Sequence, residues 1–273
     1  MSSPTSTAEP ATRPGDRWRE IVGRRAVPDA IRDAAPERDW SLEPERFRWR
    51  PDHDRERADR PSRRRALEAL PAGGSVIDVG VGGGASSLGL APRAGLIIGV
   101  DRLEGMLESF LASAAEVGVA ARAVLGTWPD VAGEVEPADV VVSHHALYGI
   151  GGIEDWVTAL TAHARHRVVL EVSHRFPQSR LLPLWRRFHG VDRPDPLVAD
   201  EIEAVLRGMG LAVEREDAVV PGRVQGVTPE NVAFARRRLY VGPERDDEIA
   251  EFLAALPADE HAVAALWWPG EAL

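Results

Sequence analysis

The chain has 273 residues, of which 44% are hydrophobic, so it can bury the core of one α/β domain with additional segments. It contains no cysteine, which excludes disulfide bonds, thiolate metal ligands and a cysteine nucleophile. The formal net charge of −10 argues against a protein that neutralises the phosphates of a long nucleic acid.

The N-terminal segments are polar and hold no apolar stretch of signal-peptide length. We expect residues 1–15 to be a disordered tail and residues 16–60 to be a helical cap on a domain that spans residues 61–273. No later run approaches the roughly 20 apolar residues that a membrane-spanning helix requires. These features predict a soluble, cytoplasmic protein with no membrane partner.

From residue 75 onward, patterns of buried strands alternate with patterns of amphipathic helices. Five strands are predicted, at "SVIDVG" (75–80), "GLIIGVD" (95–101), "ARAVLGTW" (121–128), "ADVVVSHH" (138–145) and "RVVLEVSH" (167–174). Helices are predicted at "LEGMLESFLASAAEVG" (103–118) and "EDWVTALTAHARH" (154–166). Strands rich in Val, Ile and Leu that are separated by helices imply a parallel sheet covered on both faces.

The C-terminal part of the chain changes in character. A helix is predicted at residues 199–210, followed by strands at "LAVEREDAV" (211–219) and "VAFARRRLYV" (232–241). We expect these two strands to form an antiparallel hairpin at the edge of the sheet, and a further helix covers residues 246–256. The predicted fold class is α/β: a doubly wound, mostly parallel seven-stranded sheet with an antiparallel edge hairpin and a helical N-terminal cap.

The stretch "SVIDVGVGGGASSLGLA" (75–91) places a predicted strand directly before a run of glycines. Gly80, Gly82 and Gly84 would lie in the turn that leads to a helix beginning near Ser86. Glycine adopts positive φ and lets the backbone approach a ligand closely. Open α/β folds bind their ligands at the carboxyl ends of the strands. The run therefore predicts a ligand-binding turn.

Two cofactor classes use a turn of this kind. Gly80, Gly82 and Ala85 satisfy the dinucleotide pattern G-x-G-x-x-G/A, and Asp101 follows about 20 residues later. However, Asp78 precedes the first glycine by two positions, where its carboxylate would face no cation in a pyrophosphate site. Asp78 thus counts against an NAD(P)-dependent oxidoreductase, which stays as an alternative because the glycine pattern is satisfied.

The spacing Asp78-x-Gly80-x-Gly82-x-Gly84 resembles motif I of the class I methyltransferases, which use S-adenosylmethionine. The resemblance implies that Asp78 supports the methionine amino group and that the glycines pass beneath the methionine and ribose portions. It also implies that Asp101 binds both ribose hydroxyls. A carboxylate suits these tasks because charged acceptors form the stronger hydrogen bonds. S-adenosylmethionine is therefore the expected cofactor.

Residues after the second and third predicted strands extend this resemblance. Met106 stands where the family has an adenine contact, although a core position on its helix explains it equally well. Arg102 directly follows Asp101 and is counted with the cofactor site. After the third strand, many members of the family have an acid that accepts a hydrogen bond from the adenine amino group. Thr127 stands there instead, followed by Trp128, whose ring could stack on adenine.

The fourth predicted strand ends with Ser143, His144 and His145, where the family places its reaction centre, and Ser143 is assigned to the cofactor site. The Asp/Asn-Pro-Pro-aromatic motif of amino-base methyltransferases is absent from the sequence there. The chain also lacks the cysteine of the pyrimidine carbon-5 enzymes and the acid cluster of the metal-dependent catechol type. What remains is direct in-line displacement, in which the protein orients the acceptor, excludes water and accepts a proton where needed.

Histidine is suited to accept that proton. Neighbouring residues of a strand point to opposite sides, so at most one of the two histidines is expected to face the substrate. His145 ranks slightly above His144 as the base, Tyr148 is the third catalytic candidate, and each also has a purely structural explanation. Glu171 and His174 lack metal-ligand spacing with a third group, so no metal site is expected.

Residues 173–197 form a long connection after the fifth strand, and long loops at this end of such folds often form lids. Apolar residues of this segment would then line a substrate pocket: Leu181, Leu182, Leu184, Trp185 and Phe188. The alternative is a packed amphipathic helix without substrate contact. The sequence thus predicts an S-adenosylmethionine-dependent methyltransferase that acts on a small molecule, with no nucleic-acid partner. The competing hypotheses are the oxidoreductase and a non-catalytic protein that binds S-adenosylmethionine.

Overall fold

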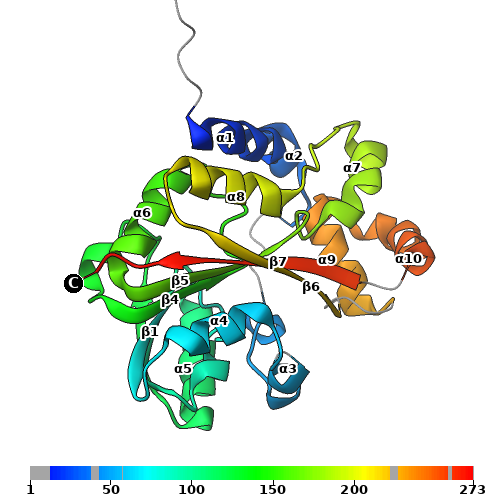
Figure 1. The fold of residues 1–273 in the computed structure, drawn as a ribbon. Helices are drawn as coiled ribbons and strands as arrows, with labels where there is room; N and C mark the ends of the chain where they lie inside the picture. Colours follow the sequence, from blue (N-terminus) through cyan, green and yellow to red (C-terminus); the bar gives the residue numbers. More distant parts are fainter. Residues whose placement is uncertain (1–12, 38–42, 57, 222–226, 258–259, 273) are drawn as a thin grey trace, which may run out of the picture.

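A seven-stranded sheet runs through the middle of the molecule in the order β3-β2-β1-β4-β5-β7-β6 (Figure 1). The computed structural model describes residues 13–37, 43–56, 58–221, 227–257 and 260–272. The strands are β1 (Gly74–Val79), β2 (Ala94–Asp101), β3 (Ala120–Leu125), β4 (Ala138–His144), β5 (Ala164–Ser173), β6 (Glu214–Pro221) and β7 (Glu260–Pro269). Neighbouring strands from β1 to β5 are parallel, whereas β7 runs antiparallel to both β5 and β6. The predicted mostly parallel sheet with an antiparallel edge is confirmed.

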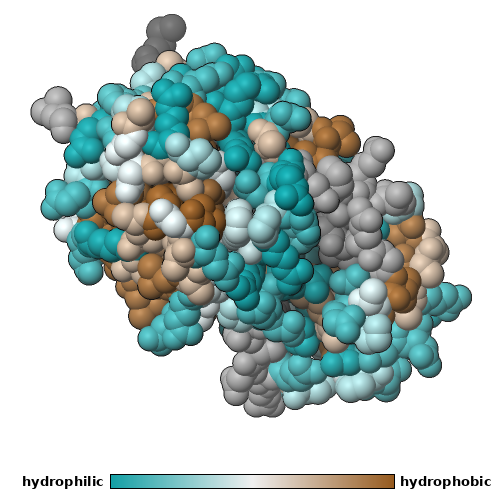
Figure 2. Space-filling model, turned by 90° about the horizontal axis from the view of Figure 1, so that it is seen from below, coloured by the Kyte–Doolittle hydropathy of each residue, from teal (hydrophilic) through white to brown (hydrophobic). Residues whose placement is uncertain are grey.

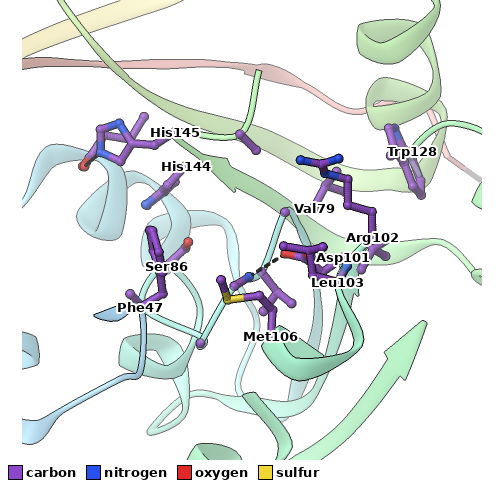
Figure 3. Close-up of a pocket in the computed structure, with 18 of the residues that line it drawn as sticks. Phe47, Val79, Ser86, Asp101, Arg102, Leu103, Met106, Trp128, His144 and His145 are labelled. Carbon is purple, nitrogen blue, oxygen red and sulfur yellow. Dashed lines mark hydrogen bonds and ion pairs between the residues drawn. The ribbon is translucent and has the colours of Figure 1, made fainter. Parts of the chain in front are cut away.

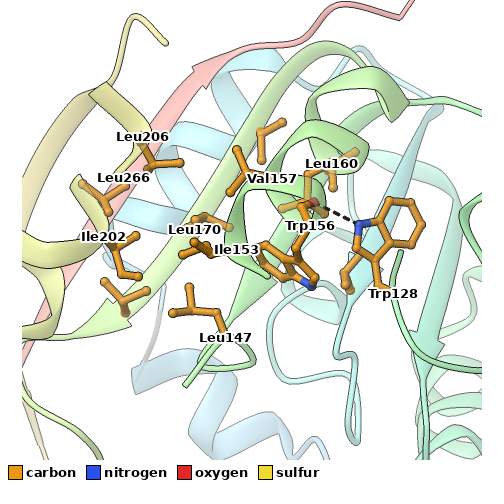
Figure 4. Packing of buried hydrophobic residues seen from close by; sticks show 14 of the residues in the cluster. Trp128, Leu147, Ile153, Trp156, Val157, Leu160, Leu170, Ile202, Leu206 and Leu266 are labelled. Carbon is orange, nitrogen blue, oxygen red and sulfur yellow. Dashed lines mark hydrogen bonds between the residues drawn. The ribbon is translucent and has the colours of Figure 1, made fainter. Parts of the chain in front are cut away.

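Helices cover both faces of this sheet (Figure 1). One face carries α4 (Pro61–Ala69) and α5 (Glu104–Val117). The other carries α6 (Ile153–His163) and α8 (Val198–Gly208), against which α1 (Pro14–Arg25) packs. Two separate clusters of buried hydrophobic side chains fill the space between helices and sheet. Figure 4 shows part of the larger cluster, where side chains of α6 and α8 meet those of β5 and β7.

The apolar character of the central strands follows from their position. Strand β1 has a strand on each side and helices on both faces, so Val76, Ile77 and Val79 are all buried. Helix α5 ends at Gly118, which adopts a left-handed conformation and donates its N–H to the carbonyl of Ala114 at 2.9 Å. Burial on both faces thus explains the short, continuous apolar runs in the sequence.

Three further helices form a lobe beyond the edge strands: α7 (Leu182–His189), α9 (Pro229–Leu239) and α10 (Asp246–Ala255) (Figure 1). They share a third hydrophobic cluster, against which Ile31 of α2 (Asp29–Ala34) packs. Helix α7 follows the carboxyl end of β5, and α9 and α10 connect the carboxyl end of β6 with the start of β7. The lobe therefore lies at the edge of the sheet where the sequence predicts a ligand.

The shorter elements are α3 (Pro51–Glu56) and the 3₁₀ turns η1 (Pro44–Arg46), η2 (Leu88–Leu90), η3 (Ala132–Glu134), η4 (Ser179–Leu181) and η5 (Pro243–Arg245).

Helices α1, α2 and α3 lie within the predicted cap. Residues 1–12 of the predicted tail fall outside the described residues. Helix α1 begins at Pro14, within the predicted tail. The division into cap and domain stays a prediction.

The strand prediction for residues 232–241 is wrong, because this segment lies almost entirely in α9. Val232, Ala235 and Leu239 recur at helical spacing and are buried against α7 and α10 in the lobe. The side chain of Thr228 caps the helix by accepting the N–H of Asn231 at 3.2 Å. Short β-branched and aromatic stretches favour a strand locally, and packing in the lobe overrides that preference.

The second strand of the edge hairpin is instead β7, which follows the last predicted helix. Its tryptophans are both buried, and they point to opposite faces of the sheet: Trp267 joins the cluster beneath α4, and Trp268 joins the cluster beneath α6 and α8. The Trp268 indole N–H donates to the hydroxyl of Thr161 at 2.9 Å. A strand buried on both faces explains two adjacent large apolar residues.

The helix predicted near Ser86 is wrong as well, because the segment contains only the 3₁₀ turn η2. Gly84, Gly89 and Pro92 disfavour a longer helix here. Seen from the side of α4 and α5, the surface is mostly hydrophilic, with a larger apolar group on the left of the view and smaller ones on the right (Figure 2). Along the described part of the chain, none of the helices combines the length and apolar character that a membrane crossing would need.

Candidate functional site

A cavity of about 610 Å³ lies at the carboxyl ends of β1, β2 and β4 (Figure 3). The glycine loop that follows β1 forms its floor. One end is lined by residues that follow β2 and β3, and the other by His144, His145 and Glu171 together with residues of the N-terminal segments. The cavity therefore joins the predicted cofactor turn to the predicted reaction centre.

The glycine loop has the backbone conformation that the sequence analysis expects. Gly80, Gly82 and Gly84 all have positive φ angles, of 76°, 51° and 88°. A Cβ atom at Gly80 would lie 2.4 Å from the Cβ of Ala146, so β1 and the segment after β4 approach each other closely only because this residue is glycine. Gly80 and Gly82 line the cavity, whereas Gly84 lies behind the loop.

Asp101 ends β2 and faces the cavity beside this loop. One carboxylate oxygen accepts the N–H of Gly82 at 3.0 Å, and the other accepts the N–H of Leu103 at 3.0 Å. A carboxylate offers about four lone-pair positions, so each oxygen retains one for a ligand. Two adjacent hydroxyl groups, as in a ribose, are a chemically suitable partner for this arrangement.

Asp78 lies beneath the loop and does not line the cavity. It is fully buried, and one oxygen accepts the hydroxyl of Ser87 at 2.7 Å, while the other has no hydrogen-bond partner among the described residues. Burial raises its pKa to about 7, against the lowering effect of the Ser87 hydrogen bond and with a further upward contribution from the charge of Asp101. The expected contact with a methionine amino group does not fit this position; Asp78 supports the loop from below.

The residues after β2 and β3 form the end of the cavity that the resemblance assigns to adenine. Arg102, Met106, Thr127 and Trp128 all line it. Trp128 is only 5% exposed, and its indole N–H donates to the carbonyl of Trp156 at 3.3 Å, so the ring belongs to the core and presents only part of its surface to the cavity. Asp130, which could have replaced the missing acid, does not line the cavity.

His144 and His145 both line the cavity, contrary to the expectation that at most one would face it. The reason is that β4 ends at His144, and His145 leaves the strand with a positive φ of 58°. A left-handed conformation costs a non-glycine residue roughly 1–2 kcal/mol. The turn thereby cancels the alternation of sides that holds within a strand.

Glu171, near the end of β5, binds three side chains at this end of the cavity. It accepts hydrogen bonds from Arg60, from the hydroxyl of Ser62 at 2.6 Å and from Nε2 of His145 at 3.1 Å. It is 1% exposed, and burial alone would raise its pKa. The hydrogen bond to His145 and the charges of His144, His145 and Arg60 outweigh burial and hold the pKa well below its usual range.

Tyr148 lies on the other side of the His145 ring, outside the cavity lining. Its hydroxyl lies 2.8 Å from Nδ1 of His145 and accepts the backbone N–H of Ser173 at 2.8 Å. It also lies 2.9 Å from the hydroxyl of Ser173, which in turn lies 2.7 Å from Nε2 of His261 on β7. The polar network around His145 therefore reaches from the N-terminal segment to the last strand.

The N-terminal segment closes the cavity over the glycine loop. The backbone N–H of Trp49 donates to the carbonyl of Gly83 at 3.1 Å, and Phe47 lines the cavity beside it. Asp54 and Arg63 form an ion pair at 3.2 Å inside the lining. In contrast, the expected pocket residues of segment 173–197 are not in the lining, because Leu181, Leu184 and Trp185 are buried within the lobe.

Comparison with known proteins decides what this architecture is. Residues 76–168 match a family model described as a methyltransferase domain. The chain contains a methyltransferase domain, and its sheet has the class I fold. No curated protein matches the chain.

Several solved structures share the fold of this methyltransferase at low sequence identity. The YcgJ protein of Bacillus subtilis has a TM-score of 0.51 and 16% identity, over 77% of this chain and 98% of its own. An S-adenosylmethionine-dependent methyltransferase of Thiobacillus denitrificans, solved with S-adenosylhomocysteine, has a TM-score of 0.50 and 18% identity, over 90% and 99%. Magnesium protoporphyrin IX methyltransferase of Synechocystis, also with S-adenosylhomocysteine, has a TM-score of 0.50 and 17% identity, over 94% and 93%.

The structure of the methyltransferase brings together most of the residues that the sequence pointed to. Those that line the cavity are Gly80, Gly82, Asp101, Arg102, Met106, Thr127, Trp128, His144 and His145. Those that do not are Asp78, Gly84, Tyr148 and Ser143. Ser143 is 1% exposed, and its hydroxyl donates to the carbonyl of Val79 at 2.6 Å, which ties β4 to β1. Its assignment to the cofactor site is therefore corrected to a support of the sheet.

Six charged or hydroxyl-bearing residues of the lining were missed: Asp54, Arg60, Ser62, Arg63, Ser86 and Glu171. Glu171 carried a signal, because an acid inside the apolar run "RVVLEVSH" must find partners when the strand is buried. Arg60 and Ser62 carried no such signal in the sequence, because they lie in a segment of mixed charge. Among the residues that the structure describes, no group of three or more His, Asp or Glu side chains is placed to hold a metal ion.

Proposed function

We propose that this methyltransferase transfers a methyl group from S-adenosylmethionine to a small molecule bound in the cavity. One observation carries the proposal: a single cavity contains the glycine loop and Asp101 at one end and His144 and His145 at the other. Its volume of about 610 Å³ lies in the range of small-molecule sites. S-adenosylmethionine, when bound, supplies a methyl group already activated by the sulfonium.

The residues at the cofactor end suit this ligand. Asp101 has lone pairs left for two neighbouring hydroxyls, and the backbone of Gly80 and Gly82 allows close approach from above. Met106 and Trp128 add apolar surface for a planar base. We assign the ribose to Asp101, the adenine to the Met106 and Trp128 end, and the methionine portion to the glycine loop.

The acceptor end suits a small molecule better than a nucleic acid. The charged residues of the lining balance one another, three arginines against three acids: Arg60, Arg63, Arg102, Asp54, Asp101 and Glu171. A balanced lining lacks the strong positive field that phosphate backbones require. Phe47 and the N-terminal segment narrow the cavity, which orients an acceptor and excludes water. The protein's contribution is thus to hold the acceptor in line with the methyl group.

Titration calorimetry tests the proposal, with S-adenosylmethionine, S-adenosylhomocysteine and NADH as ligands. We expect the two sulfur compounds to bind with micromolar affinity, which corresponds to about −8 kcal/mol, and NADH not to bind. Asp101→Ala should weaken binding about 100-fold, since hydrogen bonds to a charged group contribute about 1.5–3 kcal/mol each. Asp130→Ala removes an exposed acid outside the lining and serves as the control.

Binding of NADH alone would overturn the proposal and restore the oxidoreductase alternative. Equal affinity of the wild type and Asp101→Ala for S-adenosylmethionine would overturn the assigned position of the cofactor. Once binding is established, formation of S-adenosylhomocysteine in the presence of candidate acceptors separates a catalyst from a protein that only binds the cofactor.

A further inference from the structure

Both ring nitrogens of His145, the second of the two adjacent histidines, contact other residues of the protein. Nε2 of His145 lies 3.1 Å from Oε1 of Glu171, and its Nδ1 lies 2.8 Å from the hydroxyl of Tyr148. An imidazole has one hydrogen-bonding position at each nitrogen. Both positions of His145 are therefore occupied by residues of the protein itself.

The protonation of this arrangement follows from its partners. Glu171 is ionised and only accepts hydrogen bonds, so Nε2 of His145 carries a proton. A lone pair of the neutral ring would lie on Nδ1, which faces Tyr148. Tyr148 does not line the cavity. A group bound in the cavity thus meets no basic nitrogen of His145.

His144 occupies a different position relative to the same carboxylate. It is the register partner of Glu171 on the neighbouring parallel strand, so the two side chains lie on the same face of the sheet. Figure 3 shows His144 between His145 and the side of the cavity where Ser86 and Phe47 lie. The negative charge of Glu171 acts on His144 as well as on His145 and makes the neutral ring a stronger base.

We infer that His144 is the histidine that faces the acceptor and takes its proton, and that Glu171 and Tyr148 hold His145 as a positioning residue. This inference rests on the proposed methyl transfer. In that reaction the acceptor's lone pair forms the bond to the methyl carbon, the carbon–sulfur bond breaks with its electrons on sulfur, and a proton on the acceptor passes to His144. The charged and titratable side chains that line the cavity together with His144 are Asp54, Arg60, Arg63, Asp101, Arg102, His145 and Glu171.

The strained backbone of His145 supports this division of roles. Its positive φ places the ring between Glu171 and Tyr148, and its backbone N–H donates to the carbonyl of Glu171 at 2.9 Å. Three contacts with fixed groups offset the strain. Strain of this kind persists only where the surroundings determine the geometry, and it gathers at functional sites. His145 thereby fixes the turn that leaves His144 at the end of β4.

The test is an NMR titration of the full-length protein with isotope-labelled histidine, with and without S-adenosylhomocysteine. Signals are assigned with His144→Gln and His145→Gln. We expect the His144 ring to titrate in one step and its signals to change when S-adenosylhomocysteine binds. The His145 ring should keep a proton on Nε2 at neutral pH. In Glu171→Gln, the midpoint of the His144 titration should move to lower pH by about half a unit or more.

The opposite pattern would overturn the inference: a His145 ring that titrates with an unengaged nitrogen, beside a His144 ring that responds neither to pH nor to S-adenosylhomocysteine. An unchanged His144 midpoint in Glu171→Gln would also contradict it. The same samples report ligand binding, so a wild type that fails to bind S-adenosylhomocysteine identifies a failure of the proposed function. The titrations of the two histidine rings in the ligand-free protein do not depend on that result.

Discussion

Two carboxylates are buried at the carboxyl edge of the same sheet: Asp78 near the end of β1 and Glu171 near the end of β5. Their pKa values are shifted in opposite directions. Burial raises the pKa of Asp78 to about 7, although the hydroxyl of Ser87 donates a hydrogen bond to it at 2.7 Å. Glu171 is equally buried, yet three donors and nearby positive charge hold its pKa well below the usual range.

The difference shows that burial does not by itself decide the charge of a carboxylate. Desolvation disfavours the ionised form of both side chains, and the number and charge of the partners determine the outcome. At the end of β1, the acid braces a glycine loop and meets no cation. At the end of β5, the acid orders Arg60 and His145 beside the proposed acceptor position. Asp78 thus supports the backbone of the glycine loop, whereas Glu171 supplies a negative charge to the site.

Replacing Glu171 with leucine should have the largest effect on stability. Arg60 and His145 would lose their carboxylate while still largely buried, and breaking a buried ion pair by removing one partner costs about 3–5 kcal/mol. Urea unfolding at pH 7 measures the loss. Glu171→Gln keeps one acceptor oxygen and should lose less.

Glu68→Gln is the matched control, because Glu68 pairs with Arg65 and Arg167 at the surface. Such pairs contribute about 0–1 kcal/mol, so this variant should remain close to the wild type. If Glu171→Leu proved as stable as the control, the buried network around Glu171 would contribute no net free energy to folding. The proposed difference between the two carboxylates would then not extend to stability.

Asp78→Asn should change stability in a way that depends on pH. Between about pH 4 and pH 7, the unfolded state has released the Asp78 proton while the native state keeps it, so the stability of the wild type falls as pH rises. Asparagine has no such slope. From pH 5 to pH 8, the stability of the variant relative to the wild type should therefore increase by about 2–3 kcal/mol.

Thermal unfolding at the two pH values provides the measurement. Glu171 gives the opposite slope: its folded pKa is depressed, so its contribution is present above about pH 4.5 and is lost as pH falls. An equal difference between Asp78→Asn and the wild type at pH 5 and pH 8 would mean that Asp78 is ionised in the folded protein. Asp78 and Glu171 would then both be charged in the folded protein.

The same contrast explains what could be predicted from the sequence. The cofactor end depends on a short stretch, in which Gly80, Gly82 and Asp101 are set by one strand, one turn and the end of the next strand. Spacing along the chain is enough to place such residues at one edge of the sheet. The structure places these three residues along one cavity, whereas Asp78 lies under the loop and does not line it.

The acceptor end depends on contacts between distant segments. Arg60 lies 111 positions from Glu171, and Ser62 lies 109 positions from it. No periodicity or motif connects such residues, and the positive φ of His145 is equally invisible in the sequence. The lobe shows the same limit, because α9 takes its helical form from packing against α7 and α10, although "VAFARRRLYV" favours a strand locally.

The smallest expected effect compares two serines that each donate to one of the carboxylates. The hydroxyl of Ser62 lies 2.6 Å from Glu171 and that of Ser87 lies 2.7 Å from Asp78, and both serines are buried. Ser62→Ala should cost about 1–2 kcal/mol at both pH 5 and pH 8, because Glu171 stays ionised throughout. Ser87→Ala should cost a similar amount at pH 8 and clearly less at pH 5, where Asp78 is protonated. Urea unfolding of both variants at both pH values distinguishes the two sites, and parallel losses would show that the two carboxylates carry the same charge.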